Sequence, residues 1–160
     1  MRTAIDTSAL LALLYPDDAH NERASRLLGE AVADGSVVVT GTVETELAAD
    51  PTFETRADLD AFLSDTGIQT VTPASETRFL AGEQFCTYID RRGSELQCPA
   101  CGYETTHDCL ECDREIRSRQ RLAADFTIGA HAEREADRLL TFDAGVYETY
   151  FDVEIQTVGE

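Results

Sequence analysis

Apolar positions along this chain follow two periods in turn, as expected where short strands alternate with amphipathic helices. Alternating or continuous apolar runs predict strands at Thr3–Ile5, Ser36–Val43 and Ile68–Val71. Later runs predict two more strands, at Leu139–Phe142 and Phe151–Val158. The second of the five runs is too apolar for an exposed strand, so it predicts a central strand of a parallel sheet.

Helical spacing fills the stretches between these runs. Phe79, Leu80, Phe85 and Ile89 predict the buried face of one long helix, and Cys86 beside them is expected to be a small core residue. The predicted helices are the leucine-rich segment 10–14, His20–Ala33, a helix starting at Glu44, Pro51–Thr66, a long helix from Pro73 to Gly93, and the apolar segment around Asp125. This alternation predicts one α/β domain over residues 1–160, a three-layer sandwich with a central, mainly parallel sheet flanked by helices.

Acidic residues stand where several of these elements meet. Asp6 ends the first strand, Asp143 follows the Leu139–Phe142 run, and Asp125 lies early in an apolar helix. Glu44 and Glu46 open the helix after the second strand, and Glu46 is preferred as the inward acid because Leu47 follows it. Carboxyl ends of parallel strands share one sheet edge, so these acids are expected to gather there. Acids that merely cap helices or turns are the open alternative.

Four carboxylates in one cleft cannot all stay ionised without cations, because like charges raise one another's pKa. Mg²⁺ or Mn²⁺ suits such hard oxygen ligands, and a metal can activate water against a phosphodiester. The chain has no P-loop, no dinucleotide fingerprint and no Ser-His-Asp order to compete for the chemistry. The acids therefore predict metal-dependent phosphodiester hydrolysis, although an acidic cleft that only binds ions is also compatible.

The run CPACGYETTHDCLEC interrupts the α/β pattern with an insert at about 96–114. Its two C-x-x-C pairs can offer four thiolates to one ion, which completes the tetrahedral shell of structural Zn²⁺. Disulfides and redox chemistry are the alternatives, and His107 could compete as a ligand only if a thiolate were absent. The predicted zinc ligands are Cys98, Cys101, Cys109 and Cys112.

The net charge of the chain limits which partners it can bind. The formal net charge is −18 and all 13 basic residues are arginines, a halophile-like surface on which a nucleic acid needs a local basic patch. The insert is followed by such a cluster, predicted to bind RNA, with surface ion pairs as the alternative: Arg114, Arg117, Arg119 and Arg121. The chain has neither an 18-residue apolar run nor a signal-like start, so a cytoplasmic location is expected.

Four motifs in order along the chain resemble those of PIN-domain proteins, specifically the VapC-like toxins of type II toxin–antitoxin pairs. They are AIDTSALL at 4–11, EL at 46–47, ADFTIGAHA at 124–132 and LTFD at 140–143. The resemblance implies a PIN-like fold and an endoribonuclease whose Mg²⁺-binding catalytic acids are Asp6, Glu46, Asp125 and Asp143, with Thr7 and Thr141 in support. It also implies an RNA substrate, a cognate antitoxin and a homodimer. The cysteine insert departs from the pattern, so a PIN nuclease of ribosomal RNA maturation and a non-catalytic RNA-binding PIN-like module remain alternatives.

Overall fold

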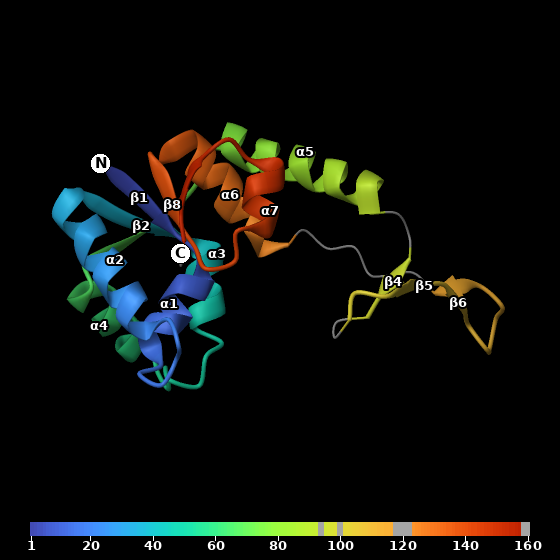
Figure 1. The fold of residues 1–160 in the computed structure, drawn as a ribbon, viewed down its shortest axis with the longest axis horizontal. Helices are drawn as coiled ribbons and strands as arrows, with labels where there is room; N and C mark the ends of the chain where they lie inside the picture. The colour runs from blue at the N-terminus through green and yellow to red at the C-terminus, as the bar shows by residue number, and fades with distance from the viewer. Residues whose placement is uncertain (93–94, 99–100, 117–122, 158–160) are drawn as a thin grey trace.

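The computed structural model describes residues 1–92, 95–98, 101–116 and 123–157 of the chain (Figure 1). Its main sheet has five strands in the order β3-β2-β1-β8-β9, and every neighbouring pair is parallel. The strands are β1 (Arg2–Ile5), β2 (Ser36–Thr40), β3 (Ile68–Val71), β8 (Arg138–Leu140) and β9 (Glu154–Gln156). The predicted α/β class with a central parallel sheet is confirmed.

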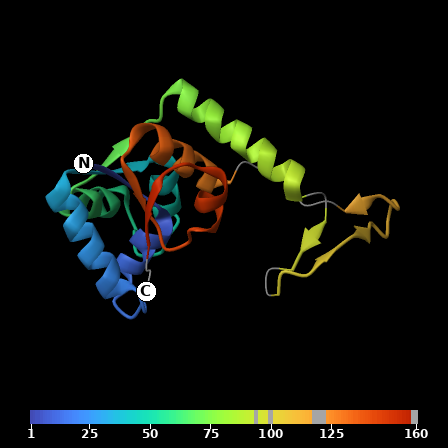
Figure 2. The same cartoon turned by 45° about the horizontal axis from the view of Figure 1, so that its top comes forward.

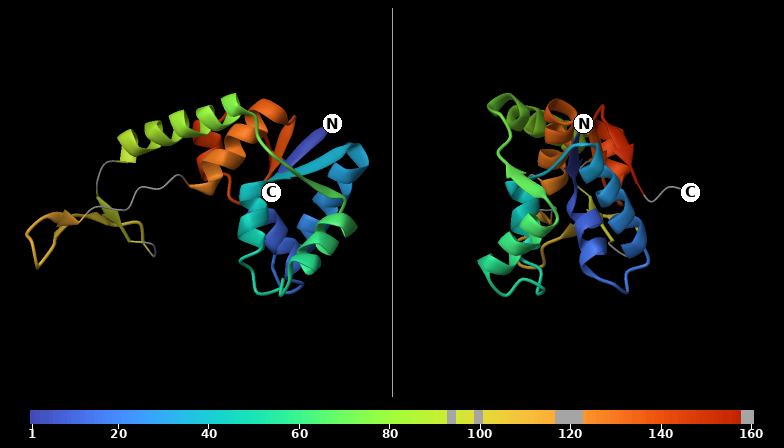
Figure 3. Two further views of the ribbon diagram at one scale, coloured as in Figure 1. Left: turned by 180° about the vertical axis from the view of Figure 1, so that it is seen from behind. Right: turned by 90° about the vertical axis from the view of Figure 1, so that its left-hand side faces the viewer.

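Helices connect the strands and cover both faces of this sheet. α1 and α2 pack together on one face, and α5 and α6 pack together on the other (Figure 3). The helices are α1 (Thr7–Leu14), α2 (Asn21–Asp34), α3 (Gly41–Leu47), α4 (Arg56–Asp65), α5 (Ser75–Arg92), α6 (Ala124–Glu135) and α7 (Gly145–Tyr150). No helix in the described part of the chain is both long and apolar enough to span a membrane.

The register of the sheet places three strand ends side by side. Ala4 of β1 lies opposite Val38 of β2 on one side and Leu139 of β8 on the other. Because all three strands run in the same direction, their carboxyl ends reach the same sheet edge. The segments that follow β1, β2 and β8 therefore begin next to one another.

Aromatic side chains cluster in the core around α6. The ring centroid of Phe126 lies 5.4–6.0 Å from those of four other aromatic side chains: Phe85, Tyr88, Tyr150 and Phe151. One turn further on, a Cβ atom at Gly129 would come within 2.4 Å of the Phe151 ring, so no other residue fits there. This close packing holds the start of α6 firmly against the sheet.

The second strand is shorter than its apolar run predicts. β2 ends at Thr40, whose last partner is Val71, and α3 already begins at Gly41. Val43, predicted as strand, is wholly buried as a helix residue instead. Continuous apolar sequence cannot separate a buried strand from a buried helix, which is why the boundary was misplaced.

Two residues predicted for the buried face of α5 are exposed. The side chain of Phe79 is 69% exposed, and Cys86 is exposed as well, so their assignment to the core was wrong. α5 packs mainly against α6, and its far end projects beyond the sheet (Figure 2). A helix that packs mainly on one neighbour buries a narrow stripe, here including Leu80 and Ala81.

Beyond α5, two small hairpins lie apart from the main sheet (Figures 1 and 2). β4 (Leu96–Gln97) pairs with β5 (Glu104–Thr105), and β6 (His107–Asp108) pairs with β7 (Glu115–Ile116), both antiparallel. These hairpins contain the predicted cysteine insert, and we refer to them as the cysteine hairpins.

Candidate active site

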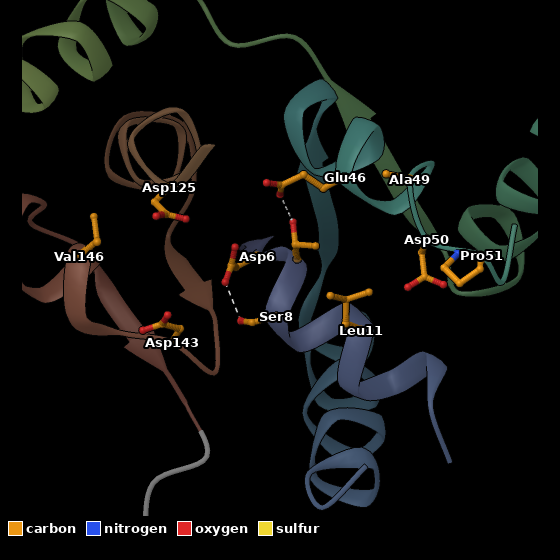
Figure 4. Close-up of a pocket in the computed structure, with 11 residues that line it drawn as sticks. Asp6, Ser8, Leu11, Glu46, Ala49, Asp50, Pro51, Asp125, Asp143 and Val146 are labelled. Carbon is orange, nitrogen blue, oxygen red and sulfur yellow. Dashed lines mark hydrogen bonds between the residues drawn. The ribbon is translucent and has the colours of Figure 1, made fainter. Parts of the chain in front are cut away.

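A pocket of about 490 Å³ opens at the carboxyl edge of the sheet (Figure 4). It is lined by Asp6, Thr7, Ser8, Leu11, Glu46, Ala49, Asp50, Pro51, Asp125, Asp143 and Val146. All four acids selected from the sequence therefore line one pocket, although they come from four separate parts of the chain. This edge is where ligands bind in open α/β sheets.

Asp6 is the most enclosed of the four acids, with 6% of the residue exposed. It follows β1 directly and is the N-cap residue of α1. Its carboxylate accepts three hydrogen bonds, from Ser8 Oγ at 2.6 Å, Thr141 Oγ1 at 2.8 Å and Tyr147 OH at 3.0 Å. A buried carboxylate needs such donors, and three of them from different elements fix its orientation.

Glu46 reaches the pocket from α3, and Thr7 donates a hydrogen bond to its carboxylate. The neighbouring acid on this helix, Glu44, instead forms an ion pair with Arg56 at 3.1 Å. Helical geometry separates residues two apart by about 200°, so only one of the two can face the pocket. The structure places Glu46 there.

Asp125 lies in the first turn of α6, and Asp143 is an exposed residue of the loop between β8 and α7. Burial raises the pKa of the Asp125 carboxyl, and the charges of Asp6, Glu46 and Asp143 raise it further. Among the residues that the structure describes, none that lines this pocket is cationic. The described lining therefore concentrates negative charge.

Two side chains of the site were missed by the sequence analysis. Tyr147 of α7 is 1% exposed, and burial together with the nearby Asp6 charge raises its pKa, so it remains a hydrogen-bond donor. Nothing local marks it, because α7 is distant in sequence from β1. Ser8 could have been found, since a hydroxyl two residues after a capping Asp is placed to bond it.

The donor set determines which metal could fit. In the described residues, no three His, Cys, Asp or Glu side chains form a ready group that could hold a metal ion. Mg²⁺ does not require such a cage, since it is usually bound through one or two carboxylates, several waters and substrate phosphates. Carboxylates that face an open pocket fit Mg²⁺ or Mn²⁺ better than a softer metal.

The described lining of this pocket includes none of the predicted zinc ligands or RNA-binding arginines. Cys98, Cys101, Cys109 and Cys112 lie on the cysteine hairpins and do not form a ready ligand group in the described residues, so zinc stays a prediction. Of the predicted RNA-binding arginines, Arg114 lies on these hairpins. Arg117, Arg119 and Arg121 lie outside the described residues, and the patch also stays a prediction.

Comparison with known proteins shows the fold and no more. No family model matches the sequence, and no curated protein matches it. Among solved structures, the chain is similar to one in the crystal structure of VapBC2 from Rickettsia felis bound to a DNA fragment from their promoter, with 15% identity, coverage of 98% of each chain and a TM-score of 0.62. It is also similar to one in the crystal structure of FitAcB from Neisseria gonorrhoeae, with 17% identity, coverage of 96% of this chain and 95% of that chain, and a TM-score of 0.55.

These findings correct the identification of the chain as a VapC-like PIN toxin. Both similar structures are toxin–antitoxin complexes, which contain antitoxin as well as toxin chains, so the likeness does not assign this chain to the toxin. At 15% and 17% identity it carries the fold alone. What stands is a similarity of fold to chains in these two complexes.

Proposed function

We propose that this chain is a metal-dependent endoribonuclease that cleaves RNA phosphodiester bonds at the pocket formed by Asp6, Glu46, Asp125 and Asp143. The observation that carries the proposal is the convergence of these four carboxylates on one open pocket. A site of that composition attracts divalent cations and, through them, phosphate oxygens.

Each of the four acids would have a role that follows from its hydrogen bonds and its exposure. Asp6, held by three hydroxyl donors, is a rigid ligand, and the exposed Glu46 and Asp143 are free to adjust to a cation and substrate. Asp125 lines the pocket from α6. The four carboxylates would hold a divalent cation there, which would supply positive charge for the scissile phosphate and lower the pKa of a water molecule.

Other hydrolytic mechanisms have less support in this pocket. None of the three histidines lines it: His131 is fully buried in α6, His20 packs on Phe142, and His107 lies in β6. Ser8 is the pocket's serine, and its hydroxyl already donates to Asp6. The pocket therefore has no histidine base that could activate a nucleophile.

A partner protein belongs to the same proposal. The chains of similar fold were crystallised as toxin–antitoxin complexes, one of them with DNA, which supports a protein partner for this chain and leaves self-association to a homodimer as an accompanying expectation. A protein that covers the open pocket would block access of a nucleic-acid strand to the carboxylates.

The test compares Glu46→Gln with Glu44→Gln, because these two acids stand two residues apart on α3 and only Glu46 lines the pocket. Purified protein in high salt is given labelled single-stranded RNA, and DNA of the same sequence, with Mg²⁺, with Mn²⁺ or with EDTA. We expect metal-dependent RNA cuts that fall about 100-fold or more in Glu46→Gln, Asp6→Asn and Asp125→Asn. Glu44→Gln should retain wild-type cleavage.

Three other results would each redirect the proposal. Equal cleavage by all variants would place the activity elsewhere or in a contaminant. RNA binding without cleavage in either metal would favour a non-catalytic binding module. Cleavage of DNA in preference to RNA would reassign the substrate while keeping the site.

A further inference from the structure

The two cysteine hairpins repeat one another at an offset of 11 residues. Strand β4 at 96–97 corresponds to β6 at 107–108, and β5 at 104–105 corresponds to β7 at 115–116. Their ladders match too, since the pair Leu96–Thr105 corresponds to His107–Ile116. Each C-x-x-C pair begins directly after the first strand of its hairpin.

The turns of the two hairpins share the same backbone hydrogen bonds. The N–H of the first cysteine donates to the carbonyl five residues on, from Cys98 to Tyr103 and from Cys109 to Arg114, both at 2.8 Å. The N–H four residues on returns to the first cysteine's carbonyl, at 2.9 Å from Gly102 and 2.8 Å from Asp113. Gly102 and Asp113 also share a positive φ, of 73° and 53° respectively.

These hydrogen bonds fold each C-x-x-C segment back on its first cysteine. In the second hairpin the Cys112 N–H also donates to the Cys109 carbonyl, at 3.3 Å. The left-handed conformation after the second cysteine raises the energy of any residue with a side chain. Because both turns adopt it, the turn requires this backbone conformation.

The short strands of the hairpins cannot by themselves stabilise two such turns. Each ladder contains two residue pairs, and Leu110 at the tip of the second turn is 99% exposed. An isolated two-stranded hairpin is marginally stable in water, so a two-pair ladder needs another source of stability. A metal ion held by both turns would provide it.

We propose that the cysteine hairpins form one module in which a single Zn²⁺ is held by Cys98 and Cys101 from the first turn and Cys109 and Cys112 from the second. The four sulfurs do not yet meet in the structure, since no group of three ligands exists in the described residues. Thr106 alone separates β5 from β6, and a change of its backbone angles would bring the two turns together on the ion. The site is structural because four thiolates leave no open position.

The fifth cysteine provides an internal control. Cys86 is exposed on α5, outside the hairpins, and would keep its reactivity when zinc is bound. In full-length protein refolded with Zn²⁺ we expect one zinc per chain by elemental analysis. Ellman's reagent should then titrate one thiol rapidly, and all five after a chelator is added. Co²⁺ in place of Zn²⁺ should give the intense sulfur-to-cobalt absorption of a four-thiolate site.

Single variants test whether both turns contribute. Cys98→Ser and Cys109→Ser should each weaken zinc binding by more than about 100-fold, since losing even an outer-shell partner costs 10–100-fold. Cys86→Ser should bind like wild type. Gly102→Ala should weaken binding about fivefold because φ is 73° there, whereas Asp113→Gly should bind at least as well as wild type.

Three results would overturn the proposal, and all are independent of nuclease activity. One zinc per two chains, with dimers that dissociate on chelation, would mean that pairs from different copies share the ion. Restored zinc binding on mixing Cys98→Ser/Cys101→Ser with Cys109→Ser/Cys112→Ser chains would mean the same. Two disulfides, with no zinc taken up after reduction, would replace the metal site by a covalent one.

Discussion

The sheet domain and the cysteine hairpins obtain their order in opposite ways. The sheet domain has a continuous apolar core in which Phe126, Leu139 and Ala130 are 1% exposed or less. The hairpins have two-residue strands, and their large side chains Tyr103 and Leu110 are 68% and 99% exposed. Burial of apolar surface is the dominant stabilising contribution in the first region and is nearly absent from the second.

The difference explains which chemistry each region can carry. A well-packed core can hold an unfavourable group, such as the buried Asp6 beside other acids, because the surrounding packing maintains the geometry. The hairpins lack such a core, and under our proposal a bound ion would stabilise them instead. The acids of the first region would then offer hard oxygen ligands to a cation, and the cysteines of the second would offer soft sulfur ligands to a structural ion.

The largest expected effect tests the contrast directly. Phe126→Ala in the sheet domain removes a fully buried ring that contacts four others, and should lower the free energy of unfolding by about 3–5 kcal/mol. Leu110→Ala in the hairpins should change it by less than about 0.5 kcal/mol. Urea unfolding followed by far-UV circular dichroism measures both. Equal losses would show that the hairpins share the core.

A smaller effect concerns pH. His131 is fully buried, neither ring nitrogen has a hydrogen-bond partner within the described chain, and burial lowers its pKa. Because the unfolded chain binds the proton more readily, stability is complete above about pH 6.5 and is lost as pH falls below it, by up to about 1.4 kcal/mol per pH unit. Glu135, 4.0 Å from the ring, limits the loss.

The His131 prediction is tested with two substitutions. Chemical denaturation between pH 5 and 8 should show that His131→Leu flattens the pH dependence of stability. His107→Leu, at an exposed hairpin position, should leave it unchanged. An unaltered slope in His131→Leu would mean that other groups cause the acid sensitivity.

The smallest effect concerns the uncompensated charge of the pocket. The raised pKa of Asp125 means that its ionised form destabilises the native state at neutral pH. In EDTA, Asp125→Asn should therefore raise the melting temperature by about 1–3 °C. Asp113→Asn, at an exposed hairpin carboxylate, should not change it. With Mg²⁺ added, wild type should gain more stability than Asp125→Asn, and the opposite order would argue against cation binding at this acid.

Local patterns in the sequence determined the order and type of the main elements. β3 matches its predicted range Ile68–Val71, and Asp6 was located at the end of β1 because a polar residue after an apolar run marks a strand's end. The selection of Glu46 over Glu44 also followed from its neighbour Leu47, which is fully buried. These features depend on residues within one or two turns of each other.

Only the tertiary structure decided what depends on distant neighbours. Phe79 looked like a core residue until α5 was seen to pack mainly against α6, and Tyr147 bonds Asp6 across 141 positions of sequence. The repeat of the cysteine hairpins is equally hidden, since beyond the cysteines the two segments share little sequence and are alike in their backbone hydrogen bonds. Side-chain pattern records local preference, whereas burial, bonding partners and backbone equivalence exist only once the chain has folded onto itself.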